Sequence, residues 1–273
     1  MHSSILGKSG RDCLAAVPLE LHGHRKKLAF FLRSLEEFRA RSGLGPAEVR
    51  VLEVGCSNGR NIALPLAGQG YQVTGVDIHE PSIAYASAQN ALPNARFICQ
   101  DFTDFASDEF FDVVVLSDIL EHVEDPLHVI RTATKHLAPG GMVLICIPNG
   151  YGPYENEQRF LRVTGLDRLI GQIIRLGKRL IQRRVEKQAE YNYDSGHVQF
   201  FRMKNIESLA TEAGLRIEER RNGALFGGGA TYYLGLLMTF IVTPSLWLAD
   251  RLPSKWVSTW YFRLEIADGS RRE

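Results

Sequence analysis

The stretch VLEVGCSNGRN, residues 51–61, constrains the fold of this chain more than any other part of its sequence. Its apolar beginning predicts a short buried strand, and Gly55 and Gly59 predict a tight turn that leads into a helix. Glycine lets the backbone approach a bound molecule closely, and the first turn of a helix offers unpaired N–H groups. The stretch therefore predicts a ligand site at the end of a strand.

Three kinds of site use a glycine turn of this type, and the neighbouring residues help to separate them. A dinucleotide-binding G-x-G-x-x-G turn would need glycine at positions 55, 57 and 60, where the chain has Gly55, Ser57 and Arg60. Residues 55–59 do match the G-x-S-x-G elbow of α/β-hydrolases, with Ser57 as the nucleophile. An elbow normally follows several strands and an oxyanion loop, and residues 1–50 predict neither. A serine hydrolase stays open as an alternative.

The third kind of site rests on a family resemblance. The chain resembles the class I S-adenosylmethionine-dependent methyltransferases, whose first motif is an acidic residue followed by G-x-G-x-G. Ser57 stands in place of the middle glycine, a change that affects the path of the loop more than the choice of cofactor. The resemblance implies S-adenosyl-L-methionine as the cofactor. The residues that it assigns to cofactor binding in this stretch are Glu53, Gly55, Ser57 and Gly59.

Further cofactor residues are expected after the next two strands. Residues 72–76 predict the second strand, and Asp77 follows it. A carboxylate about 20 residues beyond the glycines is where nucleotide-binding α/β units accept the ribose hydroxyls, so Asp77 and its neighbour Ile78 are assigned to the cofactor. After the third strand, the resemblance implies that Asp101 binds the adenine amino group and that Phe102 flanks the adenine ring.

The acceptor side of the site is expected after residues 111–116, FDVVVL, which predict the central strand. The following SDILEHV resembles the fourth methyltransferase motif, which implies that Ser117 and Asp118 border cofactor and acceptor. His122 is a candidate general base, because histidine side chains exchange protons near neutral pH. His197 is the preferred candidate, since ubiquinone-type and related small-molecule methyltransferases carry a similar His-x-x-Phe-Phe stretch beside the active site. A capping or packing role for either histidine stays open.

The predicted fold is α/β, with a doubly wound, mostly parallel seven-stranded sheet of the methyltransferase type. Four regions are expected: an N-terminal arm and helix (1–45), a cofactor-binding core (46–150), a basic helical cap (151–195) and the C-terminal part of the sheet (196–273). The helix at residues 21–42 is expected to pack through its apolar stripe, with Lys27 and the other basic residues largely off that stripe.

The C-terminal region contains a hydrophobic insertion at residues 222–250. Residues 222–249 carry no charge, but glycines 227–229 and Pro244 are expected to break the segment. We therefore expect a hydrophobic helical insertion that lines a pocket, forms a homodimer face or touches a membrane surface. Nine basic residues against two acidic ones between Arg159 and Lys187 predict a basic amphipathic helix. Peripheral membrane contact is thus expected through 168–187 and 224–248.

The overall charge and the cysteines limit the partners. A net charge of +1 argues against general nucleic-acid binding, so the expected acceptor is a small or lipid-linked molecule. The four cysteines show no paired metal-ligand spacing, and no metal site is predicted. The start of the sequence lacks a signal-peptide pattern, so a cytoplasmic protein is expected, with membrane association at the cytoplasmic face. The expected reaction is O-methylation, and a cofactor-binding subunit without activity is the remaining alternative.

Overall fold

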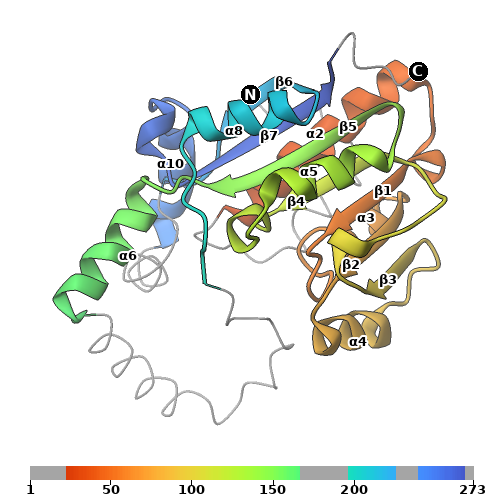
Figure 1. Cartoon of the computed structure of the whole chain (residues 1–273), viewed down its shortest axis with the longest axis horizontal. Coiled ribbons are helices and arrows are strands. Elements are labelled where there is room, and N and C mark those ends of the chain that lie inside the picture. Colours follow the sequence, from red (N-terminus) through yellow and green to blue (C-terminus); the bar gives the residue numbers. More distant parts are fainter. Residues whose placement is uncertain (1–22, 167–195, 226–238, 268–273) are drawn as a thin grey trace.

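One seven-stranded sheet organises the computed structural model, which describes residues 23–166, 196–225 and 239–267. The strands are β1 (Arg50–Val54), β2 (Gln72–Asp77), β3 (Ala95–Cys99), β4 (Phe111–Ser117), β5 (Leu137–Pro148), β6 (Leu215–Asn222) and β7 (Thr259–Ile266). Their order in the sheet is β3-β2-β1-β4-β5-β7-β6 (Figure 1). The predicted mostly parallel α/β sheet is confirmed.

Helices connect and cover these strands. The α-helices are α2 (His24–Ser42), α3 (Ala63–Gly68), α4 (Glu80–Gln89), α5 (Pro126–Lys135), α6 (Pro153–Thr164), α8 (Met203–Glu212) and α10 (Thr239–Ala249). Short 3-10 helices lie at Pro46–Glu48, Phe102–Asp104, Leu120–His122 and Ser254–Trp256. Several helices begin or end with local signals that the sequence carries: Asp125 accepts a hydrogen bond from the His128 N–H at the start of α5, and Gly43 ends α2 with φ 77°.

The register of the parallel strands brings the ends of β1, β2 and β4 together. Val54, the last residue of β1, lies opposite Val76 of β2 and Leu116 of β4. The chain leaves β1 at the point where strand order reverses, with β2 on one side and β4 on the other. In open α/β sheets, ligands bind at such a reversal, outside the carboxyl ends of the strands.

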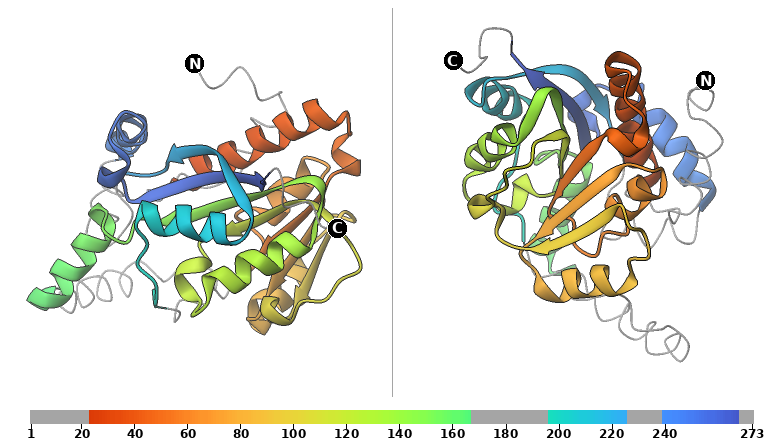
Figure 2. Two further views of the ribbon diagram at one scale, coloured as in Figure 1. Left: turned by 45° about the horizontal axis from the view of Figure 1, so that its top comes forward. Right: turned by 90° about the vertical axis from the view of Figure 1, so that its right-hand side faces the viewer.

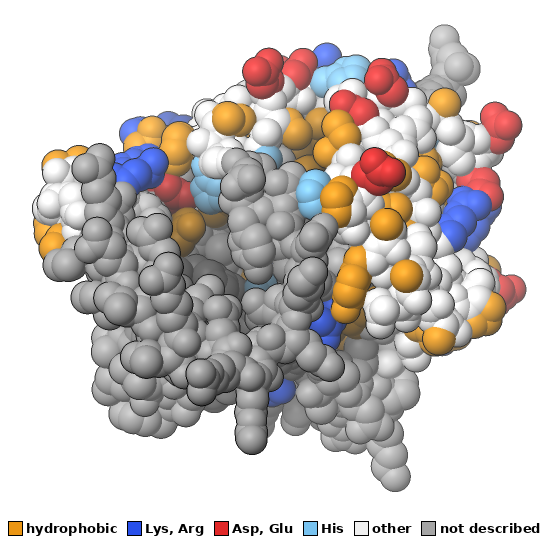
Figure 3. All heavy atoms as spheres, turned by 90° about the horizontal axis from the view of Figure 1, so that it is seen from below, with side chains coloured by type: hydrophobic (Ala, Val, Ile, Leu, Met, Phe, Trp, Pro, Cys, Tyr) orange, Lys and Arg blue, Asp and Glu red, His pale blue; other side chains and the backbone are white. Residues whose placement is uncertain are grey.

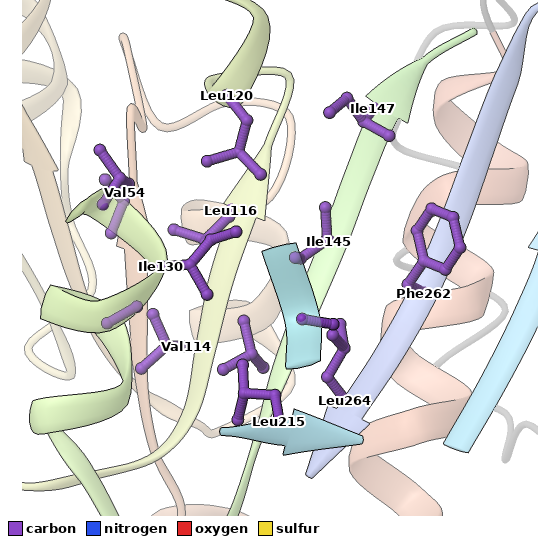
Figure 4. Packing of buried hydrophobic residues seen from close by; sticks show 14 of the residues in the cluster. Val54, Val114, Leu116, Leu120, Ile130, Ile145, Ile147, Leu215, Phe262 and Leu264 are labelled. Carbon is purple, nitrogen blue, oxygen red and sulfur yellow. The ribbon is translucent and has the colours of Figure 1, made fainter. Parts of the chain in front are cut away.

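Alternate side chains of the sheet supply two hydrophobic cores. Val114 and Leu116 pack with helices α5 and α8 on one face, where Ile130, Ile145 and Phe262 also lie (Figure 4). On the other face, residues such as Val113 and Val115 pack with α2 and α3. Figure 2 shows the sheet between these two helical layers. Because β4 is buried on both faces, residues 113–116 form a continuous apolar run rather than an alternating pattern.

Helix α2 is held against the C-terminal strands by ion pairs as well as by apolar contacts. Arg33 pairs with Glu219 of β6 at 2.7 Å, and Arg41 pairs with Glu265 of β7 at 2.8 Å. Glu37 of α2 pairs with Arg263 of β7. The helix therefore has a fixed place over the sheet, and its N-terminal half reaches the edge where β4 ends.

Three details differ from the expectations. Lys27 was expected off the packing stripe, but it is buried, because it lies one helical turn before Phe31 and shares that residue's face. Pro139-Gly140-Gly141 has a sequence typical of a turn, but β5 already begins at Leu137, and Gly140 (φ 78°) lies within the strand, where the register to β4 shifts. Pro244 does not break its segment, since α10 runs through it; the fixed φ of proline is compatible with a helix at the loss of one donor.

Some expectations concern residues outside the description. The predicted basic amphipathic helix at 168–187 and glycines 227–229 lie outside the described residues. Of the predicted membrane contact at 224–248, residues 226–238 also lie outside them. Among the residues that the structure describes, no helix combines the length and apolarity that crossing a membrane requires.

Candidate functional site

The glycine turn after β1 needs glycine at two positions. Gly55 and Gly59 both have φ 71°, in the left-handed region that side chains disfavour. A Cβ at Gly55 would come within 2.9 Å of the Ile119 side chain, and one at Gly59 within 2.6 Å of the Phe97 ring. Ser57 also has a positive φ of 48°, although it is not glycine. The middle residue of the motif thus keeps the backbone conformation that glycine would adopt.

Asp77 lies beside this turn. Its Oδ2 accepts a hydrogen bond from the Ser57 N–H at 2.7 Å, and its Oδ1 accepts one from the His79 N–H at 2.8 Å. The carboxylate therefore links the end of β2 to the glycine turn. The next side chain, Ile78, is 65% exposed at the same edge of the sheet, an unusual place for an isoleucine. Ribose binding by Asp77 stays a prediction.

Asp101 and Phe102 follow β3 and face different surroundings. Asp101 is exposed, and its Oδ1 accepts hydrogen bonds from the N–H and the hydroxyl of Thr103, both at 2.8 Å. Phe102 points into the core, where its ring stacks on Phe105 with centroids 5.6 Å apart. Only 7% of its surface is exposed, so the ring chiefly serves the core. Contacts of both residues with adenine stay predictions.

Glu53 lies within β1 and is buried. Burial raises the pKa of its carboxyl to about 8, although the positive charge of Lys27 acts in the opposite direction. Its Oε2 has no hydrogen-bond partner among the described residues. Buried polar atoms are normally paired, so this unpaired acceptor, two residues before Gly55, is a candidate contact for a ligand.

Lys27 of α2 reaches the end of β4 and forms an ion pair with Asp118. The sequence did not reveal this contact; the available signal was the i, i+4 spacing of Lys27 with Phe31. Burial alone would lower the pKa of the Lys27 ammonium, but the neighbouring acidic groups, above all the Asp118 carboxylate, together outweigh burial and raise the pKa above its ordinary value. A lysine can be buried here because its charge is paired.

Asp118 directly follows β4 and has φ 54°, a strained backbone conformation for a non-glycine residue. Its carboxylate accepts hydrogen bonds from the Ser117 hydroxyl at 3.1 Å and the Cys146 thiol at 3.2 Å. Burial acts to raise the pKa of this carboxyl, but the Lys27 ammonium outweighs it and lowers the pKa to about 2. The strained residue is thus held as a carboxylate at the strand reversal.

The two candidate histidines lie side by side. The rings of His122 and His197 meet edge to face, with centroids 5.0 Å apart. His197 Nδ1 lies 2.6 Å from Oε1 of Glu155, a buried residue of α6. The backbone of the 196–199 segment is fixed to the loop after β4, because Val198 and Gln199 donate to the Glu121 carbonyl at 2.9 and 3.1 Å. The structure therefore brings together two histidines that lie 75 positions apart in the sequence.

A cavity of about 270 Å³ joins these groups. Its lining combines charged, imidazole, thiol and hydroxyl groups from both ends of the chain: His24, Lys27, Asp118, Glu121, His122, Cys146, Pro148, Tyr154, His197, Ser258 and Thr259. Figure 3 shows histidine side chains on one face of the molecule. Glu53, the glycine turn, Asp77 and Asp101 do not line this cavity, whereas Asp118, which the sequence placed at the border of cofactor and acceptor, does.

Glu121, His122 and His197 also form a group that the sequence did not predict. One ligand atom from each residue lies within 4.8 Å of the others, which is close enough to hold a metal ion. Burial raises the pKa of the Glu121 carboxyl well above its ordinary value, and the neighbouring Asp118 charge adds to this shift. The cysteine spacing used to predict metal sites could not reveal a group made of these residues.

The surroundings of Ser57 do not resemble a hydrolase site. Its hydroxyl lies 3.5 Å from the Ser82 hydroxyl, and the Nδ1 of His79 contacts Ser82 at 2.7 Å instead. Among the described residues, no histidine ring nitrogen bonds to Ser57. The alternative of a serine nucleophile therefore gains no support.

Comparison with known proteins gives the same family from sequence and from structure. A family model described as a methyltransferase domain matches residues 22–220, well over half of the chain. A ubiquinone biosynthesis O-methyltransferase of Rickettsia akari is 32% identical over 117 residues, which are 42% of this chain and 46% of that enzyme. One of Idiomarina loihiensis is 37% identical over 105 residues, 37% of this chain and 42% of that enzyme. These matches span less than half the length of the relatives.

Solved structures share the fold at low sequence identity. An S-adenosylmethionine-dependent methyltransferase from Clostridium acetobutylicum superimposes with a TM-score of 0.53 at 12% identity, covering 89% of this chain and 92% of that one. The plantazolicin methyltransferase BpumL, in complex with a monoazolic desmethylPZN analog and SAH, gives a TM-score of 0.51 at 18% identity, covering 95% and 86%.

Proposed function

This chain belongs to the methyltransferase-domain family, and we propose that it transfers the methyl group of S-adenosyl-L-methionine to a hydroxyl oxygen of a small-molecule acceptor. The observation that carries the proposal is the edge of the sheet where β1, β2 and β4 end. The glycine turn, Asp77 and Asp118 lie at this edge, and the cavity with two histidines begins beside it. A cofactor site and an acceptor site are thereby adjacent.

The residues at the edge fit the chemical groups of this cofactor. The unpaired Oε2 of Glu53 can accept a hydrogen bond, as can the carboxylate of Asp77 from ribose hydroxyls. Ile78 offers an exposed apolar side chain to the adenine ring, and Asp101 offers an exposed carboxylate to its amino group. We place the cofactor along these residues, with Ser117 and Asp118 at its methionine end.

The bound cofactor supplies a methyl group already activated by a positively charged sulfur. The protein has to align the acceptor oxygen with that methyl group, exclude water and remove the hydroxyl proton. We assign proton removal to His197, which lines the cavity and is held by Glu155, with His122 beside it. Lys27 and Asp118 neutralise each other in the cavity wall, so the remaining proton-accepting groups of the lining are the histidines and the Glu121 carboxyl group.

The cavity and the relatives both support a small acceptor molecule with a hydroxyl group. A cavity of about 270 Å³ with polar walls suits a small molecule with a hydroxyl group. The Rickettsia akari and Idiomarina loihiensis proteins are named as O-methyltransferases of ubiquinone biosynthesis. Transfer of that chemistry to this chain, including a lipid-linked acceptor, is part of the proposal.

Peripheral membrane contact at the cytoplasmic face is also proposed, from side chains at the end of α10 and beyond. Trp247 and Trp256 are each more than half exposed, and Leu248 is exposed between them in sequence. The Arg251 guanidinium stacks on the Trp247 ring at 3.5 Å, and Lys255 adds a second positive charge. Exposed tryptophans beside basic side chains are typical of proteins that rest on anionic membrane surfaces.

Co-sedimentation with vesicles tests this contact. The chain should sediment with vesicles that contain phosphatidylserine, and Trp247→Ala with Trp256→Ala should reduce the bound fraction severalfold. The surface is a homodimer face instead if two results are found together. Vesicle binding would be unchanged in the tryptophan variants, and the same variants would dissociate a dimer that the wild-type chain forms at high concentration.

Calorimetric titration with S-adenosylhomocysteine tests the proposed cofactor, and NAD serves as the control ligand. We expect binding of S-adenosylhomocysteine at micromolar concentration and no heat from NAD. Binding without methyl transfer to any hydroxyl acceptor would instead indicate a cofactor-binding subunit without activity. An absence of binding would refute the proposed function.

A further inference from the structure

Glu155 and His197 form a contact whose geometry suits proton transfer. The two residues come from α6 and from the segment before α8, and their Oε1 and Nδ1 atoms are 2.6 Å apart. Glu155 is only 2% exposed, whereas His197 is partly exposed to the cavity. A carboxyl group removed from solvent and directed at one nitrogen of a cavity-lining imidazole determines which nitrogen faces the cavity.

Both members of this pair have fixed backbones. The start of α6 is attached to the segment before β7, because the Tyr154 N–H donates to the Ser258 hydroxyl at 3.2 Å. At Gly152, which precedes α6, a Cβ would come within 2.5 Å of the Val257 carbonyl oxygen, so the two backbones are in close contact. His197 is fixed in turn by the bonds of the 196–199 segment to the loop after β4. The two backbone segments that carry this pair are therefore each anchored to the rest of the fold.

The second ring nitrogen of His197, Nε2, is available to contact the methyl-acceptor molecule. With Nδ1 bound to Glu155, Nε2 has no hydrogen-bond partner within the described part of the chain. A neutral imidazole carries a single N–H group. If the Nδ1–H donates a hydrogen bond to the Glu155 carboxylate, the unprotonated nitrogen with the free lone pair is Nε2. That tautomer is the one able to take a proton from a hydroxyl group in the cavity.

The geometry points to Glu155 as a positioning residue, which fixes the tautomer and orientation of His197 for proton abstraction. This inference rests on the proposed function. The acceptor oxygen loses its proton to Nε2 and forms a bond to the methyl carbon, while the electrons of the broken carbon–sulfur bond return to sulfur. The products are a methyl ether, S-adenosylhomocysteine and an imidazolium, whose positive charge faces Glu155.

Nitrogen NMR of the ¹⁵N-histidine-labelled full chain tests the tautomer directly, without any turnover. In the wild type at alkaline pH, His197 should show a protonated Nδ1 and an unprotonated Nε2. In Glu155→Gln, whose amide can either accept or donate, this single tautomer should give way to a mixture. Glu157→Gln removes a carboxyl group from the same helix and serves as the matched control, with the wild-type pattern. A protonated Nε2 in the wild type, or an unchanged tautomer in Glu155→Gln, would overturn the inference.

Kinetics with catechol as the acceptor probe separates this inference from the proposed function. Glu155→Gln should lower kcat about 100-fold, with the KM for the cofactor within about twofold of wild type. In a His197→Asn background the same substitution should cause no further loss, because Glu155 acts through that ring. Full activity of His197→Asn would refute the proposed base, and the NMR result would still decide the role of Glu155. Additive losses in the double variant would refute the positioning role alone.

Discussion

Lys27 and Asp118 form an ion pair across 91 positions of the sequence, at the point where β4 ends. The contact exists because α2 lies across the sheet and directs Lys27 toward the same edge that carries the glycine turn. It joins a buried ammonium to a carboxylate on strained backbone, and through Cys146 it extends to β5. A helix that precedes the cofactor-binding core therefore contributes a wall of the candidate site.

Removal of the Lys27 charge should destabilise the protein. In Lys27→Met, the Asp118 carboxylate loses its ion-pair partner. Because 40% of the Asp118 side chain is exposed, solvent screens its charge. We therefore expect the free energy of unfolding to fall by about 2 kcal/mol, which is less than the ~3–5 kcal/mol expected for a fully buried pair. Urea unfolding at pH 7 measures the loss. Lys27→Met combined with Asp118→Asn should recover part of it, and strict additivity of the two substitutions would contradict the pair.

The same pair predicts how stability depends on pH. The pKa of Asp118 is lowered to about 2, so its contribution is complete above its unfolded value of about 4 and is lost as the pH falls through 2. The pKa of Lys27 is raised, so its contribution is complete below about 10.4 and is lost only at higher pH. In the wild type the pair should thus contribute a constant amount to the free energy of unfolding from pH 5 to pH 9, whereas in Lys27→Met the unpaired Asp118 should titrate at a higher pH than in the wild type.

Glu53, unlike the Lys27–Asp118 pair, should make the protein less stable as the pH rises. Its pKa of about 8 in the fold lies above the unfolded value of about 4.3, so ionisation of the unfolded chain opposes folding progressively between these values. Glu53→Gln cannot ionise, and its stability relative to wild type should rise by up to about 1.4 kcal/mol per pH unit in this window. Unfolding at pH 5, 6.5 and 8 measures the slope. A difference independent of pH would show that the carboxyl is not desolvated.

Asp77→Asn should weaken cofactor binding and loosen the glycine turn. The asparagine side chain keeps one acceptor oxygen, so one of the two backbone N–H groups loses its partner, together with the negative charge that ribose hydroxyls would contact. We expect the Kd for S-adenosylhomocysteine to rise at least about tenfold. Asp108→Asn, an exposed position, is the control in the same calorimetric titration. An unchanged Kd for S-adenosylhomocysteine would show that Asp77 does not bind the cofactor.

Substitutions at Ser57 test the strain in the turn. At φ 48°, glycine is better accommodated than serine and a β-branched side chain is worse. Thermal unfolding should rank Ser57→Gly at or above wild type and Ser57→Val about 1–2 kcal/mol below it. A fluorophosphonate probe should not label the wild-type protein. Labelling that Ser57→Gly abolishes would support the serine nucleophile instead.

Local patterns in the sequence were enough to predict the sheet and the elements at the edge where β1 and β2 end. The apolar run of β4, the glycine turn and the carboxylate after β2 each depend on residues close together in the chain, and the structure has all three elements near the predicted positions. Contacts between distant segments were not predictable in this way. Lys27 was expected off the packing stripe, and Glu155 carried no local signal, because its role depends on how α6 is placed against the 196–199 segment.

The position of β7 sets the order in which the chain can acquire its structure during synthesis. Residues 259–266 form the strand that separates β5 from β6, although both of those strands are translated earlier. Strands β1 to β5, with the glycine turn and Asp77, can pair as they emerge from the ribosome. In the described sheet β6 pairs with β7 alone, so it must wait for residue 266. The cofactor side of the site can therefore form on a nascent chain, while the His197 side depends on the last strand, next to which Val257 and Ser258 anchor α6.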